Sequence, residues 1–103
     1  MEILQSDSFR KWMRALPDRQ ARARIQVRID RLATGNPGDA RPIGGGLSEL
    51  RISHGPGYRV YYLRQGARLI LLLCGGDKSS QSTDIRRAHD LARDWREQEH
   101  DHG

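Results

Sequence analysis

The stretch from residue 47 to residue 78 constrains the fold most, because it contains three consecutive runs with the side-chain pattern of β-strands. In the first two runs apolar and polar residues alternate, and a strand directs alternate side chains to opposite faces. The apolar members are Leu50, Ile52, Val60 and Tyr62, and the polar-face members are Glu49, Arg51, Arg59 and Tyr61. The third run, Leu69 to Cys74, is apolar on both faces, which is typical of a strand covered on both sides. Short glycine-containing links join the runs, so we expect antiparallel hairpins.

Helical periodicity lies on both sides of this stretch. A first helix is expected before Pro17, a second after Asp18 as its N-cap, and a last one after the serines at 79–82. The second helix carries many arginines, which is more typical of a solvated or partner-binding face than of a catalytic one. Met1 to Gln5 suits an edge strand, 35–39 a loop, and the glycines at 44–46 a flexible lead-in. The expected order is β-α-α-β-β-β-α, an α+β domain with helices packed on a mostly antiparallel sheet.

The charge distribution predicts one basic domain over residues 1–96 and a short disordered acidic tail over 97–103. The chain has 103 residues, with 18 Lys and Arg against 13 Asp and Glu, and three of the acids fall in that tail. A basic body suits an anionic partner, namely a nucleic acid, an acidic protein or a membrane surface. Simple solubility is the alternative explanation of the charge.

Several classes of site have no support in the sequence. The single Cys74 cannot form an internal disulfide and suits a small core residue. The histidines have no zinc spacing, the glycine run has no P-loop lysine, and we expect neither a metal nor a cofactor. No apolar run is long enough to span a membrane and no signal peptide is visible, so the cytoplasm is the expected location.

The polar residues of the strands could bind and cleave a phosphodiester. Arg51 and Arg59 are expected on neighbouring strands and on one face, and Lys78 ends the third strand. Such cations stabilise a phosphate whose charge grows in the transition state. Cleavage of RNA without metal also needs a base and an acid. His54 or Glu49 is the candidate base, and Lys78 or His54 the candidate acid. The alternatives are an exposed ion pair for Glu49 with Arg51 and a plain turn residue for His54.

The whole pattern resembles the RelE/ParE toxin superfamily, and more narrowly its HigB-like addiction module killer branch. The resemblance covers about residues 2–96. It is carried by Phe9-x-x-Trp12-x-x-x-Leu16, Gly35-Asn36-Pro37-Gly38-Asp39, Glu49-Leu50-Arg51-Ile52, Gly55-Pro56-Gly57-Tyr58-Arg59-Val60-Tyr61-Tyr62, Leu71 through Gln81, and Asp84-Ile85. It implies a small twisted sheet packed against an N-terminal helical hairpin, with a C-terminal helix.

The resemblance also implies a function: the toxin of a type II toxin–antitoxin pair that cleaves mRNA in the ribosome without metal. The family's strand arginine maps to Arg59, its preceding basic position to Arg51, and the basic position after the last strand to Lys78. The C-terminal catalytic tyrosine of some RelE proteins has no counterpart, because no Tyr follows Trp95. The candidate RNA-binding residues are Tyr61, Gln81, Arg41 and Arg64. The expected partners are mRNA, the ribosome and a cognate antitoxin of helix-turn-helix type encoded beside the chain.

Two other functions fit the same surface. ParE relatives share the fold but inhibit DNA gyrase without being nucleases. An RNA-binding module without turnover is the third possibility. A basic face alone serves any of the three.

Overall fold

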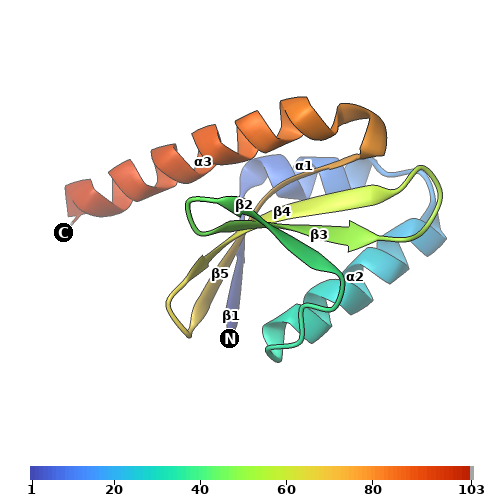
Figure 1. Cartoon of the computed structure of the whole chain (residues 1–103), viewed down its shortest axis with the longest axis horizontal. Coiled ribbons are helices and arrows are strands. Elements are labelled where there is room, and N and C mark those ends of the chain that lie inside the picture. The colour runs from blue at the N-terminus through green and yellow to red at the C-terminus, as the bar shows by residue number, and fades with distance from the viewer. Residues whose placement is uncertain (103) are drawn as a thin grey trace.

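The computed structural model describes residues 1–102, and side chains as far as residue 99. Five strands form one sheet, and three α-helices pack around it (Figure 1). In chain order the elements are β1 (Glu2–Gln5), α1 (Asp7–Ala15), α2 (Arg19–Ala33), β2 (Ala40–Gly44), β3 (Leu47–Ile52), β4 (Tyr58–Gln65), β5 (Leu69–Asp77), the 3₁₀ turn η1 (Lys78–Ser80) and α3 (Gln81–His102). The α+β class predicted from the sequence is confirmed.

The sheet is mixed, with strand order β1-β5-β4-β3-β2. β1 pairs in parallel with β5, whereas every other neighbouring pair is antiparallel. The hairpins β3–β4 and β4–β5 are those that the alternation of residues 47–78 predicts. In the β3–β4 register Arg51 lies opposite Arg59, and Glu49 lies opposite Tyr61. The predicted polar row therefore lies on one face of adjacent strands.

The structure adds a strand that the sequence did not predict. β2 occupies 40–44, between the expected loop at 35–39 and the expected lead-in at 44–46, and it pairs with β3 at the edge of the sheet. The glycines Gly44, Gly45 and Gly46 all have positive φ and form the turn between these strands. Pro42 weakened the strand pattern, because proline is confined to positions such as edge strands. The observed order is β-α-α-β-β-β-β-α.

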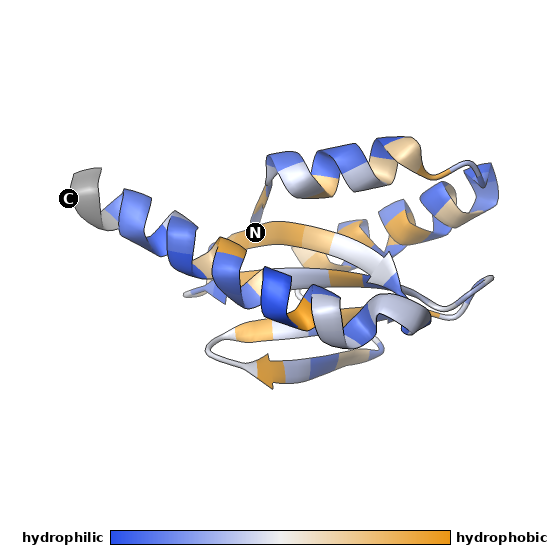
Figure 2. Cartoon of the chain, turned by 90° about the horizontal axis from the view of Figure 1, so that it is seen from above, coloured by the Kyte–Doolittle hydropathy of each residue, from blue (hydrophilic) through white to orange (hydrophobic). Residues whose placement is uncertain are grey.

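The two faces of the sheet have separate cores. On one face, Phe9 of α1 and Ala21, Ile25, Ile29 and Leu32 of α2 pack against the apolar side of the strands. On the other, Ala88 and Ala92 of α3 pack against Leu47, Tyr61, Leu63, Leu71, Leu73 and Cys74. Figure 2 shows hydrophobic residues along the central strands and a mostly hydrophilic surface along α3. Helices therefore cover both faces of the central strands.

An irregularity in β5 allows it to serve both cores. The β4–β5 register shifts between Tyr61, which pairs with Cys74, and Tyr62, which pairs with Leu72. Leu73 is the extra residue of this β-bulge, so Leu73 and Cys74 both contribute to the core beneath α3. Burial raises the pKa of Cys74 to about 12. The prediction that Cys74 is a core residue is confirmed.

Helix α3 is longer than the sequence suggested. We expected a disordered tail from residue 97, but the helix continues to His102, and residue 103 lies outside the described part of the chain. Glu97, Gln98 and Glu99 are good helix formers, and the Gln65 amide donates a 3.1 Å hydrogen bond to Glu99. Propensity and this contact explain why the acidic segment extends the helix.

Gly75 is required by the close approach of α1 to β5. A Cβ atom at this position would lie 2.3 Å from Trp12 Cε3, and Trp12 itself packs between Phe9 and Tyr58. Gly75→Ala should therefore destabilise the protein by about 1–3 kcal/mol, because the indole must move. Urea unfolding measures this change. Ser82→Ala, exposed near the start of α3, is the control and should change stability by less than about 0.5 kcal/mol. Equal unfolding midpoints for Gly75→Ala and wild type would contradict the packing described here.

Candidate functional site

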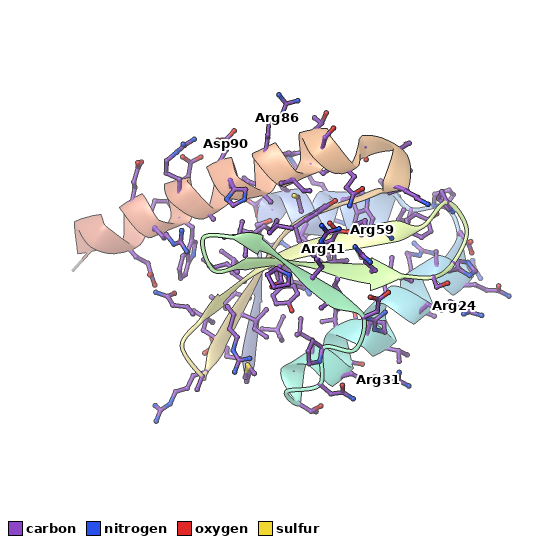
Figure 3. All side chains as sticks on the ribbon, in the orientation of Figure 1. Arg24, Arg31, Arg41, Arg59, Arg86 and Asp90 are labelled. Carbon is purple, nitrogen blue, oxygen red and sulfur yellow. The ribbon has the colours of Figure 1, made fainter. Side chains whose placement is uncertain are left out.

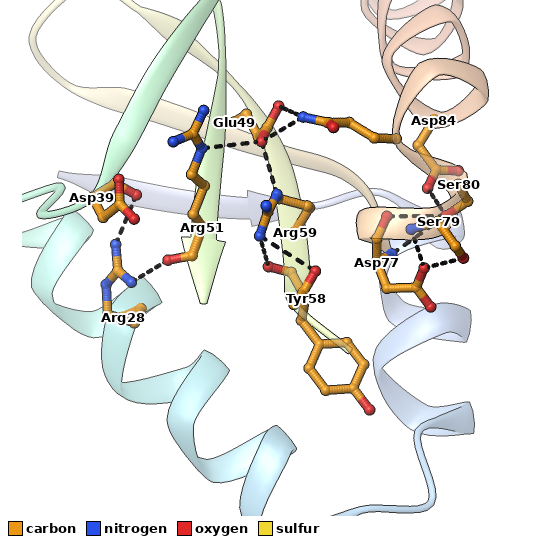
Figure 4. Close-up of polar contacts among 12 residues, drawn as sticks. Arg28, Asp39, Glu49, Arg51, Tyr58, Arg59, Asp77, Ser79, Ser80 and Asp84 are labelled. Atoms are coloured by element: carbon orange, nitrogen blue, oxygen red, sulfur yellow. Dashed lines mark hydrogen bonds and ion pairs between the residues drawn. The ribbon is translucent and has the colours of Figure 1, made fainter. Parts of the chain in front are cut away.

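The polar row on the α3 side of the sheet is centred on Glu49. This carboxylate is only 1% exposed, and it is the buried charged side chain of the described core. Arg59 Nε lies 2.9 Å from Glu49 Oε1, and Arg51 Nε lies 3.4 Å from the same oxygen (Figure 4). The Gln81 amide, at the start of α3, donates hydrogen bonds of 3.0 Å to both carboxylate oxygens. Glu49 therefore joins β3, β4 and α3.

The carboxylate makes the pairing of two arginines possible. Arg51 and Arg59 face each other across β3 and β4, and like charges placed directly opposite destabilise a sheet. Glu49 offsets this repulsion by contacting both guanidinium groups. The Arg59 side chain is 12% exposed and that of Arg51 is 32% exposed. Both cations are held in place yet remain partly accessible.

Beside these arginines the surface is hollowed by about 250 Å³. We call this the basic hollow, and its lining residues are Asp39, Arg51, Ile52, Ser53, Gly57, Arg59 and Lys78. Three of them are cations and one is a carboxylate. The structure therefore brings together Arg51, Arg59 and Lys78, as the sequence predicted, and the excess positive charge suits an anionic group.

Two local features hold Lys78 and Arg59 at the hollow. Asp77 caps the η1 turn by accepting a 2.8 Å hydrogen bond from the Ser79 amide, and bonding to Ser79 lowers the pKa of the Asp77 carboxyl. Gly57 has φ +81°, which only glycine adopts readily, and its Cα–H side faces Lys78 and Arg59. Arg59 Nη1 also donates to the carbonyl oxygens of Gly57 and Tyr58.

His54 lies in the β3–β4 loop but does not line the basic hollow. Its Nε2 is 3.0 Å from Asp18 Oδ2, and Asp18 is the N-cap of α2. The hydrogen bond from His54 and those from the α2 backbone lower the pKa of the Asp18 carboxyl. His54 thus ties the loop to the helix, in a position that does not fit its predicted role as base or acid.

The four predicted RNA-binding residues have different positions. Tyr61 is fully buried beneath α3, and burial followed by the charge of Glu49 raises its pKa far above the usual range, so it does not fit an RNA contact. Arg64 lies at the far end of β4 and bonds to Gly66. Arg41 is exposed on edge strand β2, opposite Glu49 in register, and it does not line the basic hollow. Gln81 belongs to the site through Glu49.

The sequence analysis missed two contributors to the site. Asp39 lines the hollow from the segment before β2, whereas the sequence placed it in a loop without a role. Arg28 of α2 donates to the backbone carbonyls of Arg51, Pro37 and Asp39, and so fixes this segment against β3. The Gly35–Asp39 motif was the available signal for Asp39. Nothing in the helical pattern distinguished Arg28 from the other arginines.

Neither metal binding nor membrane insertion has support in the described part of the chain. Among the described residues no group of three or more His, Cys, Asp or Glu side chains could hold a metal ion. In residues 1–102 no helix is both long and apolar enough to cross a bilayer.

The arrangement can bind an oxyanion through two guanidinium groups and one ammonium. Guanidinium groups match the geometry of phosphate oxygens, and charges held in advance stabilise a transition state without reorganisation. The Lys78 side chain is exposed and can deliver a proton. Glu49 is enclosed by its partners and has no path to a substrate. Asp39 is the carboxylate of the hollow itself.

Comparison with known proteins shows that most of this chain matches one protein family. The model of the family described as phage derived protein Gp49-like matches residues 11–96, which include every residue of the basic hollow. A protein of Haemophilus influenzae, described only as uncharacterized, is 45% identical over 94 residues, covering 91% of this chain and 95% of that protein. The chain therefore belongs to the Gp49-like family, a family associated with toxin–antitoxin systems.

Proposed function

We propose that the chain is the toxin of a type II toxin–antitoxin pair and that it acts as a metal-independent mRNA endoribonuclease. The observation that carries this proposal is the convergence of Arg51, Arg59 and Lys78 on one hollow next to a buried carboxylate clamp. Membership of a toxin-associated family and the RelE-like strand motifs around Arg59 support the same reading.

In this proposal each polar group of the hollow has a separate task. Arg59 and Arg51 bind the scissile phosphate and stabilise the charge that builds on its oxygens. Lys78 protonates the leaving 5′-oxygen. Asp39 takes the proton of the 2′-hydroxyl, in place of the predicted bases His54 and Glu49, which are engaged with Asp18 and with the arginines. Glu49 and Gln81 are positioning residues.

The partners in this proposal are translated mRNA, the ribosome and an antitoxin of helix-turn-helix type encoded beside the chain. A basic surface that cuts mRNA must be masked in the cell that makes it. The RelE/ParE topology belongs to the same proposal, and it is supported by the mixed sheet with helices on both faces.

A second candidate is inhibition of DNA gyrase by binding, as in ParE relatives. It is favoured by one observation: both bases predicted from the sequence are engaged in structural contacts. A binding inhibitor needs no base, and a basic surface with a fixed arginine pair serves this function as well.

Induced expression in a bacterial host separates the two candidates. Primer extension on abundant messages should reveal cuts inside translated codons, and Asp39→Asn should reduce them by about 100-fold if Asp39 is the base. A supercoiling assay with purified gyrase runs in parallel and should show no inhibition. Intact messages together with inhibited gyrase would favour the gyrase inhibitor over the nuclease. If messages stay intact and gyrase is not inhibited, both candidates are rejected.

A further inference from the structure

A second depression lies along the outer surface of α2, and its floor is apolar. It has a volume of about 390 Å³, and we call it the α2 hollow. Ala23, Val27 and Ile52 contribute its apolar surface, and Arg24 and Arg31 stand at its rim. Val27 is 46% exposed, more than any other large hydrophobic side chain among the described residues. An apolar floor with a charged rim is typical of a protein interaction site.

The rim carries a strong excess of positive charge. α2 contains five arginines and a single acid, Asp30, which accepts a hydrogen bond from Gln26. Arg28 is occupied by its bonds to backbone carbonyls. Arg24 and Arg31 are exposed, and among side chains as far as residue 99 neither has an ion-pair partner. Figure 3 shows both extending outward from α2.

We propose that the α2 hollow binds an acidic amphipathic helix of a partner protein. Arg24 and Arg31 are seven residues apart, or about 10 Å along the helix, with Val27 between them. A partner helix that carries two carboxylates about two turns apart can pair with both arginines. An apolar side chain between those carboxylates then packs on the apolar floor at Val27. RNA phosphates would satisfy the arginines, but RNA bases stack mainly on aromatic side chains, and the lining of the α2 hollow contains none. The apolar floor therefore favours a protein.

The position of the hollow gives this contact a regulatory consequence, which rests on the proposed nuclease function. The α2 hollow and the basic hollow share Ile52 and Ser53 as lining residues. A helix seated against Val27 therefore covers one wall of the basic hollow and obstructs the approach of a nucleic acid strand. We infer that the partner inhibits without contacting Arg59.

A displayed library of random peptides about four helical turns long provides the probe. The library is selected on the wild-type protein and then depleted on the Val27→Asp variant. Enriched peptides should be acidic and carry a leucine or a similar residue between two carboxylates. Their affinity, measured by fluorescence anisotropy, should fall by about tenfold or more in Arg24→Glu/Arg31→Glu, a variant that plays no part in the selection. The exposed Arg86 and Arg93 of α3, which are also seven residues apart, supply the matched double reversal, and Arg86→Glu/Arg93→Glu should bind as wild type does.

Each outcome bears on the proposal. Failure to enrich any peptide, or enrichment of basic or neutral sequences, would overturn it. So would peptides whose affinity survives Arg24→Glu/Arg31→Glu while circular dichroism shows that this variant is folded. A short single-stranded RNA whose binding depends equally on Val27 would assign the surface to nucleic acid instead. A selected peptide should also block RNA cleavage by wild type. If wild type cuts no RNA, the proposed function fails, while the affinity measurements still decide the docking site.

Discussion

Arg59→Ala should lower the rate of RNA cleavage by about 100- to 1,000-fold, the usual cost of removing one fixed group that stabilises transition-state charge. Arg59 has this effect because its guanidinium is held by Glu49 and by two backbone carbonyls, so it needs no reorganisation as charge develops. Arg59→Lys should give an intermediate rate, since an ammonium keeps the charge but loses the planar fork. Single-turnover cleavage of a labelled message by purified protein measures all three rates.

A matched control distinguishes the effect of removing Arg59 from the effect of losing one positive charge anywhere on the surface. Arg68 lies in the turn between β4 and β5, at the end of β4 opposite to Arg59, and it is exposed. Arg68→Ala removes the same charge and should cut at the wild-type rate. Because Arg59→Ala leaves Glu49 with fewer partners, the folding of this variant must be checked by urea unfolding.

Lys78→Ala provides an independent test, because Lys78 is exposed and its removal leaves the buried ion pairs of Glu49 intact. The rate of RNA cleavage should fall by about 100-fold in this variant. Wild-type rates of cleavage in both Arg59→Ala and Lys78→Ala would refute the proposed mechanism.

Glu49→Gln should destabilise the folded protein by about 3 kcal/mol, the lower end of the cost of removing one partner from a buried ion pair. The substitution keeps the shape of the side chain but removes the charge that lies between Arg51 and Arg59. Those two cations then face each other across the strands without a counter-ion. The partial exposure of Arg51 reduces the cost, because water screens its charge. Urea unfolding at neutral pH measures the change.

A double-mutant cycle assigns this loss to the ion pair. Arg59→Met removes the other partner, and Glu49→Gln/Arg59→Met removes both. The double variant should be less destabilised than the sum of the single variants, with a coupling of about 1–3 kcal/mol. Additive losses would show that Glu49 stabilises the sheet by packing or through Gln81 alone. The single variant should also lose cleavage activity, since its arginines are no longer held at the hollow.

The central hairpins could be predicted because their local pattern and their burial agree. Strict alternation in β3 and β4 placed Arg51 and Arg59 on the same face, and Asp18 was recognised as a helix cap. β2 was missed because a single proline and three glycines suggest a loop, whereas pairing with β3 decided the conformation. The end of α3 was missed because composition alone suggested a tail. Both errors concern segments whose structure depends on contacts with distant residues.

The site was predicted as a set of cations but not as a buried network. The sequence showed that Glu49 and Arg51 share a face, yet it gave no sign that α3 would cover Glu49. That burial arises because Gln81, at the start of α3, reaches back to β3. His54 was given a catalytic role from its chemistry alone, and its contact with Asp18 depends on how α2 packs. Side-chain identity was visible in the sequence, whereas accessibility was a property of the fold.

The parallel pairing of β1 with β5 makes closure of the sheet a late event when the chain folds as it is synthesised. Glu2 pairs with Leu69, and Lys78 and Gln81 lie further along the chain still. A chain emerging from the ribosome in order cannot close this sheet, or assemble the basic hollow, until β5 and Lys78 have left the exit tunnel. Any activity that depends on the basic hollow therefore begins only after that segment has emerged and Gln81 has reached Glu49.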